Sequence, residues 1–323
     1  MKKMGIFLMI LFLFPFSCWA YSNRIIVGGE TIGIEVHSKG VYIVGFYSVT
    51  HKNLGVDAGF QIGDKILSVD NRNVSTIEDL NHILVEEKTY QFEVLRNEKK
   101  KTISLRVIYE DGMIRTGLYV KDQINGIGTL SYIDPETNIY GSLGHEILES
   151  ASRQKFAVKD GYIYEAKVTS IDKSRNGLTG SKNALLKRKN IYGTVEFNEE
   201  EGIFGKYTKE YLPDGIMEVG ESKDIHTGKA IIRTVIADNQ VREYDIDIKA
   251  INEDNSNKNI LFEITDKALL QEAGGIVQGM SGSPIIQEDK IIGVVNYVIV
   301  EDTKMGYGIF ITTMLKKGDE VFS

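Results

Sequence analysis

A serine stands between glycines near the C-terminal end of the chain, in the stretch 279–284 with the sequence GMSGSP. Glycines on both sides let the backbone turn sharply and leave the hydroxyl uncovered. In such a turn the N–H groups of Gly279 and Ser281 can point at the oxyanion that forms when the hydroxyl attacks a carbonyl. These residue types indicate a nucleophile at Ser281, with Ser283 as its rival. A plain turn between two strands uses the same residues and is the alternative.

A nucleophilic serine needs a base within hydrogen-bond reach, and the base needs an orienting group. In the C-terminal two thirds of the chain only His145 and His226 can be that base. His145 follows a glycine at the end of a predicted strand, whereas His226 lies in a polar turn, so we expect His145 to act. Asp266 follows another predicted strand and is our candidate for the orienting acid. Its rivals on spacing alone are Asp172, Asp238, Asp245 and Asp247.

The composition limits what else the protein can be. A chain of 323 residues predicts two domains, and 42% apolar residues suffice for real cores. Glycine is abundant at 32 and proline scarce at 4, which fits a chain of many short strands and turns. A net charge of −7 without a long basic run makes nucleic acid an unexpected partner. With one cysteine and no HExxH sequence, neither a disulfide within the chain nor a metal or cofactor is expected.

The first 20 residues have the pattern of a targeting segment. Two lysines precede an apolar run, and small residues at Cys18 and Ala20 permit cleavage before Tyr21. The apolar run is shorter than the roughly 20 residues of a spanning helix. Residues 1–20 are therefore predicted to be a secretory signal peptide, with an uncleaved N-terminal membrane anchor as the alternative. Either way we expect the protein to work outside the cytoplasm.

Residues 28–108 predict a small domain of strands and helices. Its most specific stretch is 58–70, AGFQIGDKILSVD, followed by a helix over 75–84 with a capping box at its start and by strands over 90–96 and 101–108. This arrangement resembles a circularly permuted bacterial PDZ domain, which binds a peptide as an added strand. The resemblance implies that Ile32, Gly33 and Ile34 belong to the peptide-binding loop and that Leu80 and Leu84 line the groove. Ordinary core packing is the alternative for the apolar residues.

Residues 109–125 have mixed polarity and are expected to form a linker. The remainder, 126–318, shows a helical period only near 181–186. Strands are predicted at several other places, typical of a β-barrel or sandwich: 128–133, 162–171, 191–197, 229–236, 244–251 and 260–264. The expected fold is therefore mainly β, a PDZ domain followed by a β-barrel or sandwich. The sequence GMSGSP around Ser281 resembles the loop around the nucleophile of chymotrypsin-like serine peptidases, which implies a chymotrypsin-like β-barrel peptidase domain.

The chain resembles the stage IV sporulation protein B family of signalling serine peptidases. The resemblance lies in the order of a signal segment, a PDZ domain and a barrel, and in three stretches: GIGTL at 126–130, SLGH at 142–145 and GGIVQGMSGSP at 274–284. The resemblance implies Ser281, His145 and Asp266 as nucleophile, base and acid, with self-cleavage. It also implies secretion into the space between the forespore and mother-cell membranes. There such peptidases cut a regulator of a membrane metalloprotease, which triggers a late mother-cell sigma factor.

Two other functions remain open from the residues. One is a secreted PDZ adaptor whose barrel has lost activity and only binds its partners. The other is a peptidase of the high-temperature-requirement type, against which the domain order argues, because there the PDZ domain follows the peptidase.

Overall fold

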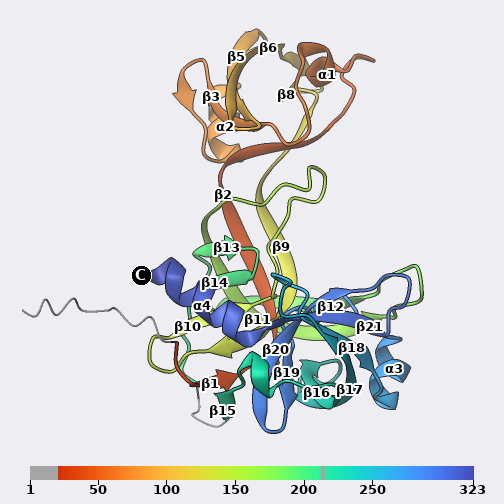
Figure 1. The fold of residues 1–323 in the computed structure, drawn as a ribbon. Helices are drawn as coiled ribbons and strands as arrows, with labels where there is room; N and C mark the ends of the chain where they lie inside the picture. Colours follow the sequence, from red (N-terminus) through yellow and green to blue (C-terminus); the bar gives the residue numbers. More distant parts are fainter. Residues whose placement is uncertain (1–20, 212–214) are drawn as a thin grey trace, which may run out of the picture.

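A computed structural model describes residues 21–211 and 215–323. The predicted signal or anchor at residues 1–20 lies outside these ranges. Two units stand apart in the fold, and two long strands run between them, β2 (Thr31–Phe46) and β9 (Leu118–Ile133) (Figure 1). The chain is mostly strand, as expected from the many short β-branched runs.

The smaller unit contains the segment predicted to be a PDZ domain. Its sheet joins the C-terminal half of β2 to β3, β3 to β5, and β5 to β6. The buried side chains of these strands form one core with Leu80 and Ile83 from the helix. Its elements are α1 (Leu54–Ala58), β3 (Lys65–Val69), β4 (Arg72–Asn73), α2 (Ile77–Ile83), β5 (Thr89–Arg96) and β6 (Lys99–Arg106), followed by the hairpin of β7 (Ile108–Glu110) and β8 (Met113–Arg115).

Local sequence signals explain two of these elements. The Thr76 hydroxyl accepts from the Asp79 N–H at 3.1 Å and the Asp79 carboxylate accepts from the Thr76 N–H, which is the predicted capping box of α2. Between β5 and β6 the two turn residues Asn97 and Glu98 both have positive φ, which matches the twist of a tight hairpin.

The larger unit begins with a sheet around the N-terminal half of β2. There β2 lies between β9 and β11, and its side chains Ile32, Ile34 and Val36 point into one core. The other strands of this half are β1 (Arg24–Val27), β10 (Ile139–Ser142), β11 (Val158–Asp172), β12 (Ser181–Thr194), β13 (Phe197–Glu199) and β14 (Gly202–Lys206).

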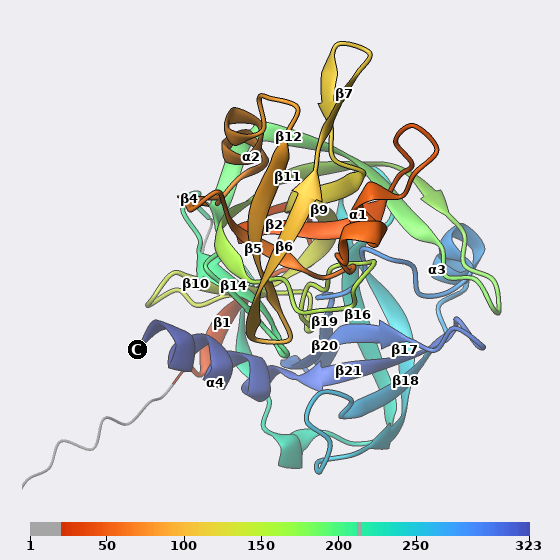
Figure 2. The ribbon, with the colours of Figure 1, turned by 90° about the horizontal axis from the view of Figure 1, so that it is seen from above.

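The second half of the larger unit is a further set of antiparallel strands around its own core. Strand β17 illustrates its construction, because Tyr244, Ile246 and Ile248 point inward at every second position. The closing helix α4 packs Ile311, Met314 and Leu315 into a third core of the larger unit. Figure 2 shows α4 running from the end of β21 to the C-terminus. The elements are β15 (Ile216–Val219), η1 (Ser222–Asp224), β16 (Gly228–Val235), β17 (Val241–Ile251), β18 (Ile260–Ile264), α3 (Lys267–Ala273), β19 (Pro284–Gln287), β20 (Lys290–Val298), β21 (Met305–Phe310) and α4 (Ile311–Phe322).

Three expectations about this organisation need correction. Residues 118–125 are not a linker but the first half of β9, hydrogen-bonded to β2. Residues 31–36, which were predicted to open the PDZ domain, lie in a strand of the larger unit, as do residues 24–27 before them. Residues 181–186 begin strand β12, because pairing with β11 overrides their helical period.

Candidate active site

The loop that carries Ser281 connects α3 to β19 and is fixed on every side by main-chain hydrogen bonds. The Gly282 N–H donates to Val295 O at 2.7 Å, and the Thr129 N–H donates to Ser281 O at 3.0 Å. Gly279 and Gly282 have φ of 94° and 92°, which only glycine adopts without strain. A side chain at Gly282 would also collide with the backbone of β9. The flanking glycines are therefore required by the turn, as the sequence pattern indicated.

Two N–H groups of this loop are left free. The N–H groups of Gln278, Met280, Gly282 and Ser283 all donate to main-chain oxygens. Within the described residues, those of Gly279 and Ser281 have no acceptor, and both residues line one cavity of about 500 Å³. Unpaired, oriented donors of this kind can stabilise an oxyanion.

His145 reaches the same cavity from the other side. It follows β10 through a turn in which Leu143 and Gly144 both have φ of 72°. Its ring is half-buried and stacks on Tyr297, with ring centroids 5.5 Å apart. Its Nδ1 lies 2.8 Å from the main-chain oxygen of Glu146. A proton on Nδ1 satisfies that oxygen and leaves the Nε2 lone pair available as a base.

Burial lowers the pKa of His145 below its ordinary value of 6.5, although the Glu146 carbonyl and the Glu146 charge act in the opposite direction. The imidazole is therefore neutral at neutral pH, which is the state a general base needs.

The structure brings Ser281 and His145 to one cavity without a hydrogen bond between them. The Ser281 hydroxyl donates instead to Asn296 O at 3.3 Å. In enzymes without substrate, catalytic hydrogen bonds are often long or misaligned and tighten only in the complex. The arrangement can therefore support attack by a serine hydroxyl on a carbonyl seated between Ser281 and the two free N–H groups.

The rivals of these two residues lie in unsuitable places. Ser283 is fully buried and turns toward the Thr129 hydroxyl at 3.5 Å. His226 is exposed, and its Nε2 lies 3.0 Å from a Glu288 carboxylate oxygen. Contact with the Thr227 carbonyl and with Glu288 raises the pKa of His226. Neither residue lines the cavity of Ser281.

Asp266 is not brought to His145. It is the N-cap of α3, where its carboxylate accepts from the Leu269 N–H at 2.8 Å. Within the described residues, the only hydrogen-bond partner of the His145 ring is the Glu146 main chain. The four other candidate aspartates (Asp172, Asp238, Asp245 and Asp247) do not line the cavity either. The expectation that Asp266 orients the base therefore has no contact in this structure to support it.

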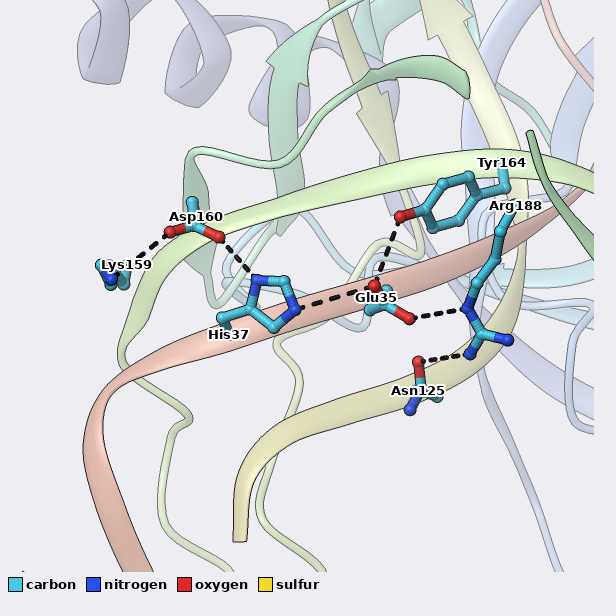
Figure 3. Close-up of polar contacts among 7 residues, drawn as sticks. All are labelled: Glu35, His37, Asn125, Lys159, Asp160, Tyr164 and Arg188. Carbon is cyan, nitrogen blue, oxygen red and sulfur yellow. Dashed lines mark hydrogen bonds and ion pairs between the residues drawn. The ribbon is translucent and has the colours of Figure 1, made fainter. Parts of the chain in front are cut away.

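The segment predicted to bind a PDZ ligand is placed elsewhere, which corrects the prediction. Ile32, Gly33 and Ile34 lie in β2 with β9 on one side and β11 on the other, so no edge is free for a peptide. Ile32 and Ile34 are buried in the core of the larger unit. Hydrogen bonds and ion pairs between side chains also connect β2 to its neighbours (Figure 3). Glu35 accepts from Arg188 at 2.9 Å and from the Tyr164 hydroxyl at 3.3 Å.

Leu80 and Leu84 are also not groove residues. Both are buried, at 4% and 7% exposure, in the core of the smaller unit. The alternative reading, ordinary core packing, is therefore the one that holds for these two positions.

The sequence reasoning missed several residues around the cavity. Tyr297 and Asn296 come from β20, and their part follows only from the pairing of that strand. Lys182 and Thr129 contact the Ser281 loop from two other strands. No motif marks these four, because each is distant in sequence from Ser281 and is brought to it by the sheet.

No helix within residues 21–211 and 215–323 is long and apolar enough to cross a membrane. In the same two ranges, no group of three or more His, Cys, Asp or Glu side chains could hold a metal ion.

Comparison with known families identifies the two units. The model of the SpoIVB peptidase S55 family matches residues 112–315, and the PDZ domain model matches residues 31–107. The fold is mainly β, with a PDZ domain and a chymotrypsin-like barrel, and the family match makes the protein a serine peptidase. The chain belongs to the SpoIVB peptidase S55 family, whose model covers more than half of it. The predicted order of the two domains is thereby confirmed.

Solved structures are more distant. The Rv3671c protease from M. tuberculosis in its active form is 13% identical, covering 59% of this chain and 71% of that one, with a TM-score of 0.33. The HtrA-type protease AlgW with a decapeptide is 10% identical, covering 92% of this chain and 65% of that one, with a TM-score of 0.38. Likeness at this level carries no argument about the site. No curated protein matches the chain.

Proposed function

We propose that this serine peptidase cuts peptide bonds by acyl transfer through Ser281 and His145. The Ser281 hydroxyl attacks the carbonyl carbon while His145 Nε2 takes its proton, and the same proton is returned to the leaving amine. Water then attacks the acyl-enzyme with His145 again as base, which releases the acid product and frees Ser281. The N–H groups of Gly279 and Ser281 receive the oxyanion. One observation carries this proposal: His145, Ser281 and Gly279 line a single cavity, and the N–H groups of Gly279 and Ser281 have no acceptor within the described residues.

The orienting role in this proposal falls to a main-chain oxygen. The Glu146 carbonyl holds the Nδ1 proton at 2.8 Å, which fixes the tautomer that a carboxylate fixes in other triads. Asp266 keeps its role as a helix cap. A rearrangement that carried Asp266 to His145 would leave the Leu269 N–H without its acceptor.

The biological role that we propose is signalling during endospore formation. The peptidase cuts a regulator of a membrane metalloprotease, and also its own chain, in the space between the forespore and mother-cell membranes. The support is the family membership together with the PDZ domain ahead of the peptidase domain.

For the substrate we propose an extended peptide segment that pairs with the open edge of β9. Thr129 donates its N–H toward the Ser281 loop, and Leu130 donates to Glu30 on the opposite side. Because N–H directions alternate along a strand, the N–H of Ile127 faces the same side as that of Thr129. Strand pairing on that side starts only at Leu130 within the described residues, and a side chain at Gly126 would meet open space.

The substitution Ile127→Pro removes the N–H at this edge. It should therefore slow cleavage of a protein substrate and spare labelling of Ser281 by a small fluorophosphonate. Equal loss of cleavage and labelling would refute edge pairing.

The first experiment uses the protein lacking residues 1–20. The purified chain is incubated alone, and its fragments are mapped by mass spectrometry beside a Ser281→Ala control. We expect defined fragments from the wild type and none from the control. In an endospore-forming host, the same substitution should abolish activity of a late mother-cell sigma factor reporter. If the purified wild type yields defined fragments but the reporter stays active in the Ser281→Ala host, the peptidase activity stands and the signalling role is refuted.

A second candidate is a binding protein with an inactive barrel. The observation that favours it is the hydrogen bond from Ser281 to Asn296 O in place of one to His145. Identical behaviour of wild type and Ser281→Ala in both experiments would support this candidate.

A further inference from the structure

Lys182 is a buried lysine without a carboxylate partner. Its side chain is 4% exposed, and its Nζ lies near three threonine hydroxyls. The distances are 2.9 Å to Thr234, 3.3 Å to Thr31 and 3.4 Å to Thr129. Within the described residues no acid forms an ion pair with it, and burial lowers its pKa to about 7. Burying an ammonium without a counter-charge costs several kcal/mol, so a specific use of this side chain is the natural explanation.

The main chain of Lys182 controls the direction of one oxyanion donor. Its N–H donates to Gln278 O at 2.9 Å, and the Gln278 N–H donates to Gly180 O at 2.9 Å. In a trans peptide unit the C=O and the following N–H point in opposite directions. Because Gln278 O turns toward Lys182, the N–H of Gly279 turns away from it, to the cavity side.

The side chain of Lys182 acts on the next peptide unit. The Thr129 hydroxyl donates to Gly279 O at 2.7 Å. The single hydroxyl proton of Thr129 goes to Gly279 O, so toward Lys182 the hydroxyl can only accept. Nζ carries N–H donors both as an ammonium and as a neutral amine, so it can donate to Thr129 in either state. The carbon stem of Lys182 also packs beneath the loop, since a Cβ at Gly279 would lie 3.1 to 3.2 Å from it.

Gly279 makes such a restraint necessary. Glycine occupies positive and negative φ with similar ease, so the peptide units beside it can rotate at little cost. Rotation of the Gly279–Met280 unit would release its oxygen from Thr129. Rotation of the Gln278–Gly279 unit would turn the Gly279 N–H out of the cavity and a carbonyl oxygen into it. A carbonyl in that place would repel the oxyanion.

We propose that Lys182 is a positioning residue for the oxyanion hole, which it holds in its active orientation through the Thr129 hydroxyl and Gly279 O. The inference rests on the proposed roles of Ser281 and Gly279. It predicts that Lys182 and Thr129 act as one unit and that their loss slows the chemical step without weakening the binding of a ligand in the cavity.

The test measures phosphonylation of Ser281 by a fluorophosphonate probe, with separate values for initial binding and for the bond-forming rate. Lys182→Met keeps the apolar stem and removes the amino group, and Thr129→Val keeps the shape and removes the hydroxyl. We expect each to lower the bond-forming rate by about 10- to 100-fold, less than or comparable to the loss of one oxyanion donor. Initial binding should change by less than about twofold. Thr129→Ser, which restores the hydroxyl, should recover most of the rate.

The double variant Lys182→Met with Thr129→Val separates this role from general damage. If the two residues form one unit, the double variant loses no more than the worse single variant. Multiplied losses, or wild-type rates in both single variants with intact thermal unfolding, would overturn the inference. In the second case Ser281→Ala would still abolish labelling, so the proposed function would stand. If wild type and Ser281→Ala label alike, both proposals fail.

Discussion

Replacing Asp266 distinguishes a helix cap from a catalytic acid. The Asp266 carboxylate accepts from the Leu269 N–H at 2.8 Å, and α3 is anchored in the core by Leu269 and Ala273. Loss of such a cap costs about 1 kcal/mol of the free energy of unfolding, which lowers the melting temperature by about 2–4 °C in a domain of this size. Asparagine caps a helix as well as aspartate does. Asp266→Ala should therefore be less stable than wild type, whereas Asp266→Asn should match it.

If Asp266 were the acid of a catalytic triad, its replacement would affect the rate of reaction instead. Losing that carboxylate costs about 10⁴-fold in rate, for asparagine as well as for alanine. The cap role predicts that both variants keep fluorophosphonate labelling within about threefold at a temperature well below unfolding. Thermal unfolding by circular dichroism and labelling rates, measured on the same preparations, decide the matter. A stable Asp266→Asn variant with labelling reduced by several orders of magnitude would refute the reasoning and return Asp266 to the triad.

Three further predictions follow from local structure. Gly33→Ala should destabilise the protein by about 1–3 kcal/mol, because its Cβ would lie 2.5 Å from Leu186. The control Gly126→Ala, whose Cβ would meet open space, should not, and equal denaturation midpoints of the two variants would contradict the placement of β2. Because burial lowers the pKa of His145, the acid limb of labelling rate against pH should have its midpoint below 6.5, and a midpoint above 7 would contradict the buried neutral imidazole. Because the folded-state pKa of Lys182 is about 7 against 10.5 unfolded, the unfolded chain binds the extra proton between these values. Wild-type stability should therefore rise relative to Lys182→Met by about 1.4 kcal/mol per pH unit between pH 7 and 10, and parallel curves would show that the amine is not buried.

Signals that are local in sequence predicted local structure well. The capping box of Thr76 and Asp79 and strand β18 at Ile260–Ile264 follow directly from residue type and spacing. The turn that exposes Ser281 follows as well, because its glycines leave few other conformations. In each case the controlling interactions lie within a few residues of one another.

Features set by distant strands could not be predicted in this way. Ile32 and Ile34 have the pattern of a ligand-binding loop, but pairing with β11 makes them central strand residues. Asp266 has a suitable spacing to Ser281, but α3 needs it as a cap. Lys182 reads as an exposed lysine until the sheet places three threonine hydroxyls around it. These outcomes depend on which strands become neighbours, and that is decided by the whole core.

The most direct test of the account is labelling of the intact protein at Ser281. Wild type, Ser281→Ala, Ser283→Ala and His145→Ala are treated with a fluorophosphonate at pH 7.5, and the modified residue is located by mass spectrometry. The account predicts modification of Ser281 in wild type and in Ser283→Ala, none in Ser281→Ala, and a rate reduced by about 10⁴-fold or more in His145→Ala. Modification at another serine, or an undiminished rate in His145→Ala, would contradict it.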